Sequence, residues 1–325
     1  MASKITIPDL KKIRVTDPLF SHYAGMVAKK MIPVQWEILN GKQGQSRCFC
    51  IDNFRIAGGT LQGEHRGVVF GDTDAYKWLE AVAYCANNGE TEYIPQADEL
   101  IEIIGQAQQP DGYLNTYFTV CHPELRWKNL TEGHELYSAG HLIEAAVAYY
   151  NATGKRRLLD IAAKFADLIC QTFGDGEGQI PGYPGHQEIE LALVKLWRVT
   201  GEDRYLKTAR FFLDCRGRTP NYLLREMNDP NHKVIFPELR NYDPSYSQSH
   251  VRPVEQKTME GHAVRAMYQC SAMADLADIQ QDEALRNACQ TLWDNVTKRR
   301  MYITGGIGST RVGEAFTVDG DLPNE

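Results

Sequence analysis

The feature that most constrains the fold is an internal repeat of a helical hairpin. Residues 148–169 and 195–214 share the pattern T-G-x-x-R-x-L, with Gly154 and Gly201 in matching positions. Apolar residues recur at steps of three and four on both sides of each glycine, which predicts two helices joined by a short turn. Glycine readily ends a helix in the left-handed conformation before the chain reverses. A weaker copy of the unit covers 279–296.

The same periodicity predicts eight helices along the chain. They are Lys77–Ala86, Asp98–Gln106, Leu136–Tyr150, Leu158–Thr172, Glu188–Val199, Tyr205–Leu213, His262–Ile279 and Glu283–Val296. A ninth is expected within Phe20–Leu39, where Pro33 must either kink the helix or begin its last turn. Strand-like alternation is found mainly in Cys48–Ile56 and Gly67–Phe70. The expected class is therefore all-α with minor β elements.

Repeated antiparallel hairpins can stack into a solenoid or close into a ring of inner and outer helices. Long loops on one rim favour the ring, so we expect an (α/α)6-type toroid and treat residues 1–325 as a single domain. Six hairpins need twelve helices, and the pattern predicts nine. Either the last helices are missing at the C-terminus, which we favour, or the count misses helices in the non-periodic segment Gly217–Glu260.

Charge and composition exclude several classes of protein. The formal charge is −7, from 42 acidic and 35 basic residues spread along the chain without a dense basic face, so nucleic acid is not an expected partner. No stretch approaches the roughly 18 to 20 apolar residues of a membrane span, and no signal-peptide core is visible. We expect no membrane association and a cytoplasmic location. The eight cysteines are scattered, and the lone pair Cys48 and Cys50 lacks the second ligand pair of a zinc site, which indicates structural thiols.

Two loops carry polar and aromatic residues that a ring mouth could present. In the first, Asp72 or Asp74 is placed to cap the helix that follows. In the second, a Pro-Asp-Gly turn at 110–112 would present Tyr113 and Asn115 to a cleft. A purely structural turn is an equally good interpretation of the second loop.

Three histidines stand next to glycines at predicted hairpin entrances: His134, His186 and His262. Tyr137 and His141 follow His134 at helical spacings, so the three side chains fall on related helix faces. Imidazoles exchange hydrogen bonds with hydroxyls, and neighbouring aromatic rings offer apolar faces, a combination that suits a sugar. A core histidine packed beside an aromatic ring is the alternative for each one alone. Metal binding competes, but no H-E-x-x-H spacing occurs.

Glu314 is the best candidate for a catalytic acid, because it lies on a glycine-punctuated turn near the end of the chain. A general acid must be protonated before it acts, so we expect partial burial or a nearby anionic group to raise its pKa. A glutamate that only caps a helix or forms a salt bridge is the alternative.

Seven motifs along the chain occur together in a fixed order. They are Y-K-W-L-E (Tyr76–Glu80), Q-x-P-D-G-Y-L (Gln108–Leu114), H-E-L-Y-x-x-G-H (His134–His141), G-H-Q-E-I-E-L-A-L (Gly185–Leu193), E-G-H-A-V-R (Glu260–Arg265), R-R-M-Y-I-T-G-x-I-G-S-T (Arg299–Thr310) and G-E-A-F-T (Gly313–Thr317). From near Met31 to its last residue, the chain resembles the β-L-arabinofuranosidase family, glycoside hydrolase family 127. The resemblance implies a six-hairpin catalytic ring followed by β-sandwich domains, retaining hydrolysis of L-arabinofuranosides or related sugars, and a bound zinc ion.

The resemblance also implies roles for individual residues. Glu314 corresponds to the family's general acid/base, and His134, His186 and His262 correspond to histidines that line its sugar pocket. The family's nucleophile is a zinc-bound cysteine in a later Cys-Cys pair, and its other zinc ligands lie in an E-T-C element just beyond D-L-P-N. This chain ends at D-L-P-N-E, and none of its cysteines matches those positions. Zinc is thus expected for the complete family member, with no ligands in this chain.

Other functions stay open at this point. A polysaccharide lyase or sugar epimerase could use the same kind of ring, and an Arg-Tyr pair near His262 would favour the lyase. A non-catalytic carbohydrate-binding fragment is a third class. The expected partner in each case is a carbohydrate, and a homodimer is a compatible assembly. The sugar could be arabinofuranose, a branched acidic deoxy sugar or another furanoside.

Overall fold

The computed structural model describes residues 8–42, 48–311 and 313–323. Within these ranges the regular structure is helical, and β pairing is limited to two isolated bridges, Phe173 with Ile180 and His262 with Ala315. The chain divides into two compact units. The N-terminal unit extends to Arg126 and includes Ser138–Ile169, and the C-terminal unit comprises Trp127–Tyr137 and the chain from Cys170 onward. None of the described helices is long and apolar enough to cross a bilayer.

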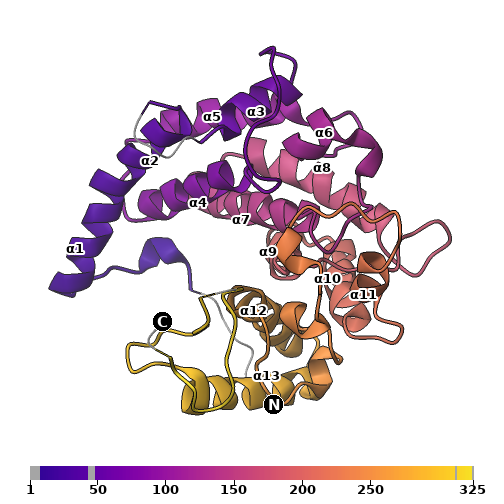
Figure 1. The fold of residues 1–325 in the computed structure, drawn as a ribbon. Helices are drawn as coiled ribbons and strands as arrows, with labels where there is room; N and C mark the ends of the chain where they lie inside the picture. Colours follow the sequence, from indigo (N-terminus) through magenta and orange to yellow (C-terminus); the bar gives the residue numbers. More distant parts are fainter. Residues whose placement is uncertain (1–7, 43–47, 312, 324–325) are drawn as a thin grey trace. The chain divides into compact units, whose positions relative to one another are not determined.

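Helices α1 to α8 belong wholly or mainly to the N-terminal unit (Figure 1). They are α1 (Pro18–Met26), α2 (Ile32–Leu39), α3 (Cys50–Ala57), α4 (Thr73–Asn87), α5 (Ile94–Ala107), α6 (Thr116–Cys121), α7 (Glu135–Thr153) and α8 (Arg157–Thr172). Helix α3 packs against α5 and α6, and α2 packs against α4. The last residues of α8 and the first three of α7 belong to the C-terminal unit.

The C-terminal unit contains the remaining described helices, coloured orange to yellow at its end in Figure 1. They are α9 (Ile189–Thr200), α10 (Asp203–Cys215), α11 (Tyr222–Met227), α12 (Ala263–Ile279) and α13 (Glu283–Asn295). Helix α9 packs against α10 and α12, and α12 packs against α13. The long connection between α11 and α12 contains the short 3-10 turns Pro237–Leu239, Pro244–Ser247 and Pro253–Glu255.

The predicted hairpin turns are confirmed in both copies of the repeat. Gly154 and Gly201 follow the last residues of α7 and α9 with φ of 75° and 76°. The preceding threonines, Thr153 and Thr200, act alike: each hydroxyl donates to the carbonyl four positions earlier, at 2.7 and 2.9 Å. Each also accepts from the backbone N–H two positions later, at 3.1 and 3.3 Å. The T-G pair therefore ends one helix and directs the chain into the next.

The predicted strand over Cys48–Ile56 is wrong, because this segment forms helix α3. Cys50, Ile51, Asn53 and Phe54 are all buried, which is the spacing of one helix face. Asn53 lies on that face because its amide donates to the backbone carbonyl of Arg66 at 2.8 Å and accepts from the Arg66 N–H at 3.1 Å. The second predicted strand, Gly67–Phe70, is also wrong, since it forms turns that lead into α4.

The ninth predicted helix exists in two parts around a π-helical segment, Val27–Met31. Pro33 lies in the first turn of α2 rather than in the last turn of a longer helix. The π segment bonds the Ile32 N–H back to the Val27 carbonyl, so the missing N–H of the proline falls where the hydrogen-bond ladder is already displaced. Helices α6 and α11 were not predicted, and α11 lies inside the non-periodic segment 217–260.

Asp72 occupies the N-cap position of α4, but its side chain does not cap that helix. It accepts from the backbone N–H of Thr116 at 2.8 Å and from the Thr116 hydroxyl at 2.5 Å instead. Burial raises the pKa of Asp72 to about 6, although the two bonds from Thr116 act in the opposite direction. The carboxyl therefore joins the start of α4 to the start of α6.

The turn at 110–112 is structural, so the predicted presentation of Tyr113 and Asn115 to a cleft is wrong. Tyr113 is fully buried and packs edge-on against Phe165, with 5.4 Å between ring centroids. Asn115 is also buried and caps α6 by accepting from the Phe118 N–H at 3.1 Å.

Two glycines of the N-terminal unit should differ in their tolerance of alanine. Gly154 has φ of 75° and open space around an added Cβ, so Gly154→Ala should cost about 1 kcal/mol of unfolding free energy. Gly112 has φ of 94°, and an added Cβ would lie 2.7 Å from the backbone carbonyl oxygen of Lys164. Gly112→Ala should therefore cost clearly more, about 2 to 4 kcal/mol. Urea unfolding followed by circular dichroism measures both, and equal costs would contradict this account.

Candidate active site

The three predicted histidines form a row in the C-terminal unit. His134 precedes α7, His186 lies in the loop before α9, and His262 is the N-cap of α12. The ring centroids of His134 and His186 are 5.6 Å apart, and those of His186 and His262 are 5.4 Å apart. All three side chains are buried. Residues more than 120 positions apart in the sequence therefore meet at one place.

The glycines beside these histidines allow close backbone approach. At Gly185 an added Cβ would lie 2.2 Å from the carbonyl oxygen of Thr131, and at Gly261 it would lie 2.1 Å from that of Ser245. Side chains cannot fit at such distances, so the two loops can pack only with glycine at these positions. The pairing of glycine with histidine noticed in the sequence therefore reflects tight loop packing around the imidazoles.

The hydrogen-bond partners of the imidazoles determine their tautomers. Nδ1 of His134 lies 2.5 Å from the carbonyl oxygen of Glu132, and Nδ1 of His186 lies 2.7 Å from that of Gln187. Carbonyls only accept, so both Nδ1 atoms donate and each neutral ring keeps an acceptor at Nε2. His262 has the opposite arrangement. Its Nδ1 accepts from the first backbone N–H groups of α12, which leaves the hydrogen on Nε2.

Burial and one buried guanidinium keep the three imidazoles neutral. Burial, followed by the charge of Arg265, lowers the pKa of His134 to about 3 and that of His262 to about 4. The same causes lower the pKa of His186 well below its ordinary value. Arg265 is only 3% exposed and donates to the Gly185 carbonyl and the Ser247 hydroxyl, both at 2.9 Å. The row therefore offers hydrogen-bonding groups without a charge of its own.

Glu314 joins this row at His262. Its Oε2 lies 3.2 Å from the His262 Nε2, which carries the hydrogen and donates to the carboxyl group. The backbone holds the two residues together, since the Ala263 N–H donates to the Glu314 carbonyl at 2.9 Å and His262 pairs with Ala315 in an antiparallel bridge. Glu314 itself adopts the left-handed conformation, with φ of 48°. A non-glycine residue held there needs strong local support.

The last two sequence motifs supply that support. The Thr310 hydroxyl accepts from the Ala315 N–H at 2.8 Å, and the Thr310 N–H donates to the Ala315 carbonyl at 3.1 Å. Phe316 then inserts into an apolar cluster with Met259 and Leu292. The Glu314 side chain remains 74% exposed. The burial that the sequence analysis expected around this carboxyl is therefore not provided by the described residues.

Aromatic rings surround the row of imidazoles. The centroid distances are 4.3 Å from Tyr137 to His186, 6.0 Å from Tyr268 to His186, 5.6 Å from Tyr246 to His262 and 5.6 Å from Phe236 to His134. Only Tyr137 was predicted. Phe236 and Tyr246 lie in the non-periodic segment between α11 and α12, where the sequence gives no local signal. Tyr268 lies on α12 six positions after the N-cap His262, which is not a spacing that places two residues on one helix face, so its approach to His186 had no sequence signal.

Arg265 is the last residue of the E-G-H-A-V-R motif, and the sequence pattern predicts no role for it. The sequence feature that could have indicated its burial is the position of a basic residue on the apolar face of α12, between Ala263 and Ala266. His141, which was predicted to share a helix face with His134, is buried in the N-terminal unit.

An Arg-Tyr pair does lie near His262, as the lyase alternative required. The guanidinium carbon of Arg265 is 4.6 Å from the centroid of the Tyr246 ring. The guanidinium is buried, however, and its Nη1 is held by a backbone carbonyl and a serine hydroxyl. This geometry is that of a structural cation beneath the histidines rather than of a clamp for a substrate carboxylate.

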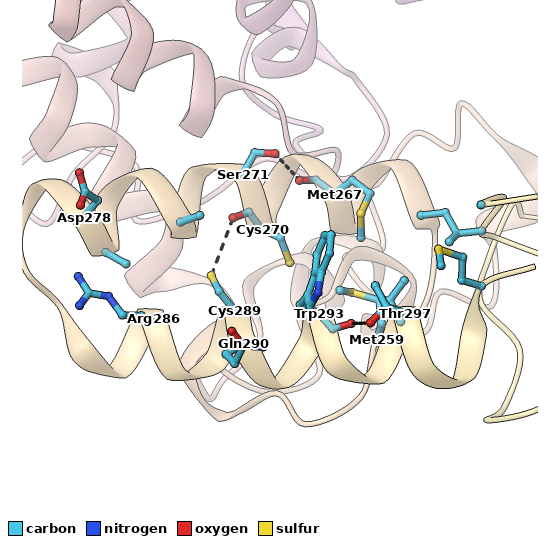
Figure 2. Close-up of a pocket in the computed structure, with 16 residues that line it drawn as sticks. Met259, Met267, Cys270, Ser271, Asp278, Arg286, Cys289, Gln290, Trp293 and Thr297 are labelled. Carbon is cyan, nitrogen blue, oxygen red and sulfur yellow. Dashed lines mark hydrogen bonds between the residues drawn. The ribbon is translucent and has the colours of Figure 1, made fainter. Parts of the chain in front are cut away.

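A separate cavity of about 810 Å³ lies along α12 and α13 (Figure 2). Its lining is mainly apolar and includes Met259, Met267, Cys270, Cys289, Trp293 and Ile307. Sugars need several convergent hydrogen-bonding groups. The row of histidines brings three imidazoles and a carboxyl group together, whereas the lining of the cavity is mainly apolar, so the row is the candidate active site.

The described residues do not reproduce the zinc site expected of the family. Within 8–42, 48–311 and 313–323, no three His, Cys, Asp or Glu side chains come together as metal ligands. All eight cysteines are free. The expected ligands in an E-T-C element and a Cys-Cys pair stay a prediction for the complete family member.

Acid should destabilise the protein through the buried imidazoles. The pKa of histidine is near 6.5 in an unfolded chain, whereas burial in the folded protein lowers the pKa of His134 to about 3 and that of His262 to about 4. The unfolded state therefore binds more protons between pH 6.5 and 4, and the unfolding free energy should fall as the pH decreases through this window. His262→Asn keeps an N-cap and should reduce that slope by about one proton. Urea unfolding from pH 7 to 4 tests this, and an unchanged slope would exclude His262 as a contributor.

Removing the charge of Arg265 should raise the pKa of all three histidines. The guanidinium disfavours each protonated imidazole, so Arg265→Gln should shift the three titrations upward while burial still holds them below 6.5. The C2–H resonances of the imidazoles, followed by NMR against pH, report each value. Replacement of the distant exposed Arg286 by Gln is the matched control and should leave them unchanged. Unaltered titrations in Arg265→Gln would show that burial acts alone.

The described chain is similar to known glycoside hydrolases in both sequence and structure. The family model for the GH127 catalytic domain of β-L-arabinofuranosidases matches residues 12–325. The non-reducing end β-L-arabinofuranosidase of Bifidobacterium longum subsp. longum is 39% identical over 331 aligned residues, which cover 96% of this chain and 50% of that protein.

Solved structures agree with the sequence comparison. The crystal structure of a GH127 β-L-arabinofuranosidase from Geobacillus stearothermophilus T6 matches with a TM-score of 0.90 and 53% identity, over 96% of this chain and 49% of that one. A GH127 β-arabinofuranosidase structure matches with a TM-score of 0.84 and 36% identity, over 97% and 47% of the two chains. This chain spans about half the length of these relatives, and the similarity confirms the predicted all-α fold class. The chain belongs to the β-L-arabinofuranosidase family, glycoside hydrolase family 127, and corresponds to its catalytic domain.

Proposed function

We propose that this chain is the catalytic portion of a glycoside hydrolase that cleaves β-L-arabinofuranosides with retention of configuration, and that Glu314 is its general acid/base. The observation that carries the proposal is the 3.2 Å contact between Glu314 Oε2 and His262 Nε2, at the end of a row of neutral imidazoles. Family membership supports the reaction class. The printed activities of the relatives support the sugar.

The role of Glu314 follows from the charge that develops during glycoside cleavage. The leaving oxygen gains negative charge as the anomeric carbon becomes oxocarbenium-like, and it needs a proton. Glu314 donates that proton from one carboxyl oxygen while the other accepts from His262 Nε2–H. After the transfer the carboxylate keeps this hydrogen bond, which stabilises the negative charge. The carboxylate then takes a proton from the incoming water as the sugar is released.

His134 and His186 suit a sugar that donates hydrogen bonds. Both rings are neutral and have an acceptor at Nε2, because their Nδ1 atoms donate to backbone carbonyls. Furanose hydroxyls would donate to these two atoms, and the neighbouring tyrosine rings would cover the apolar side of the sugar. A sugar whose hydroxyls are blocked by methylation would lack both donors and should bind poorly.

Retention requires a nucleophile on the face of the sugar opposite the acid. We assign that role to no residue of this chain. Zinc is proposed only for the complete family member, since the described residues do not supply its ligands, and no step given above depends on it. We further propose a cytoplasmic protein, in keeping with eight free cysteines. The homodimer stays a prediction.

Replacement of the acid should abolish turnover and spare binding. In the complete protein, Glu314→Gln keeps the shape and the hydrogen bond from His262 but cannot donate a proton to the leaving group. Hydrolysis of an aryl β-L-arabinofuranoside should fall about 10²- to 10⁴-fold. The dissociation constant for L-arabinose, measured by calorimetry, should change less than about threefold. Glu283→Gln, on the exposed start of α13, is the control and should keep full activity.

Near-normal hydrolysis by Glu314→Gln would remove this residue from the mechanism. NMR of the first-formed product tests the stereochemistry separately, because an inverted anomer would exclude the retaining reaction. A panel of furanosides, including branched acidic sugars, would decide the substrate.

A further inference from the structure

Two segments of the C-terminal unit, about 100 residues apart in the sequence, are joined by two glutamates, and each glutamate accepts hydrogen bonds from the backbone of the other segment. Glu226 of α11 accepts from the backbone N–H groups of Leu130 and Thr131 at 2.9 and 2.7 Å. In the opposite direction, Glu132 accepts from those of Ile235 and Phe236 at 3.2 and 2.7 Å. We call these two reciprocal contacts the carboxylate clasp. The clasp joins the segment that precedes His134 to α11 and to the connection between α11 and α12.

Glu132 is the more deeply enclosed half of the clasp. Its residue exposure is 0%, and its Oε2 lies 2.7 Å from Nε2 of His232, whose side chain is 4% exposed. Asn129 reinforces the same junction, because its amide donates to the Lys233 carbonyl at 3.0 Å and its oxygen accepts from the Glu132 N–H at 2.9 Å. A carboxylate only accepts hydrogen bonds, and every group facing Glu132 is a donor. The buried group is therefore fully satisfied.

The same residue also determines the state of His134. The Glu132 carbonyl accepts from His134 Nδ1, which fixes the tautomer with its acceptor at Nε2. His134 is in the left-handed conformation, with φ of 54°, so its backbone depends on the surrounding contacts. The side chain of Glu132 meanwhile holds the backbone of Phe236, whose ring lies 5.6 Å from the His134 imidazole. Glu132 thus holds the His134 imidazole through its backbone carbonyl, and it holds the neighbouring Phe236 through its side-chain carboxyl group.

We propose that Glu132 is a positioning residue of the sugar pocket, which acts through His134 and Phe236 and does not touch the substrate. This inference rests on the proposed function for its effect on catalysis, although its structural part does not. It assigns a role to the non-periodic connection between α11 and α12, whose His232–Phe236 stretch then forms a wall of the pocket. Neither Glu132 nor His232 takes part in the proton transfer proposed for Glu314.

Glu132→Gln replaces one acceptor oxygen by an amide that presents hydrogens. Its –NH₂ would face either the Phe236 N–H or the Ile235 N–H and His232, so at least one buried donor loses its partner. The connection should then shift away from His134. The lost hydrogen bond moves residues that contact the substrate and not the group that transfers the proton. KM for the aryl arabinofuranoside should therefore rise about tenfold, whereas kcat should fall less than about threefold.

A double-mutant cycle in the complete protein tests whether Glu132 acts through His134. Glu132→Gln, His134→Ala and the double variant are compared by KM and kcat. The proposal expects Glu132→Gln to raise KM about tenfold in the wild-type background and clearly less, about threefold, in the His134→Ala background, where only the contribution through Phe236 remains. Equal effects in both backgrounds would overturn it. Glu238→Gln, an exposed glutamate of the same connection, is the matched control and should behave as wild type.

A measurement without substrate separates this inference from the proposed function. The ¹⁵N shifts of the His134 imidazole should show hydrogen on Nδ1 in the wild type and a mixture of tautomers in Glu132→Gln. His232→Leu removes one donor to the Glu132 carboxyl group but keeps the bonds from the Ile235 and Phe236 N–H groups. This variant replaces Glu132→Gln in the experiment if Glu132→Gln does not fold. It should change the ¹⁵N shifts of His134 in the same direction by a smaller amount. Unchanged shifts in every folded variant would overturn the positioning role. A wild-type protein that shows the expected tautomer but hydrolyses no arabinofuranoside would refute the proposed function alone.

Discussion

The arrangement of the candidate active site depends on how His262 caps helix α12. Its Nδ1 accepts from the free N–H groups of the first turn, a role that is usually taken by a short oxygen-bearing side chain. Because that nitrogen is occupied as an acceptor, the hydrogen of the neutral ring must lie on Nε2. That hydrogen is directed at the Glu314 carboxyl group, 3.2 Å away. A structural requirement of a helix terminus thereby sets the direction of a hydrogen bond at the proposed acid.

The second constraint is electrical neutrality, which the burial of the row and Arg265 enforce together. Three imidazoles within 6 Å of their neighbours could not all be charged, and the buried guanidinium adds to that penalty. Arg265 lies near a second buried guanidinium, Arg216, which pairs with the buried Glu190 at 3.2 Å. Such groups are costly to bury and need complete hydrogen bonding.

The N-terminal unit shows the contrasting use of similar residues. Asp72 and Tyr113 have the types and positions expected of a ring mouth, yet the first joins two helix starts and the second is packed against Phe165. Their neighbours explain the difference, because the Asp72 carboxyl accepts from the backbone and hydroxyl of Thr116 and the Tyr113 ring is buried against Phe165. A carboxylate or tyrosine in a loop therefore indicates a functional site only when its partners leave a group available.

The sequence alone determined the features that depend on short-range patterns. The T-G turns, most helices of the hairpins and the all-α class follow from helical periodicity and from the local hydrogen bonds of Thr153 and Thr200. The motifs also identified the three histidines and Glu314. Only the tertiary structure decided what depends on partners far away in the chain. The burial of Asn53 depends on hydrogen bonds to the backbone of Arg66. The tautomer of His134 depends on a loop that is held by residues about 100 positions away. The positions of the Phe236 and Tyr246 rings beside the histidines depend on a segment without periodicity. Such contacts connect backbone groups that carry no sequence signature, so no pattern of residue types could have predicted them.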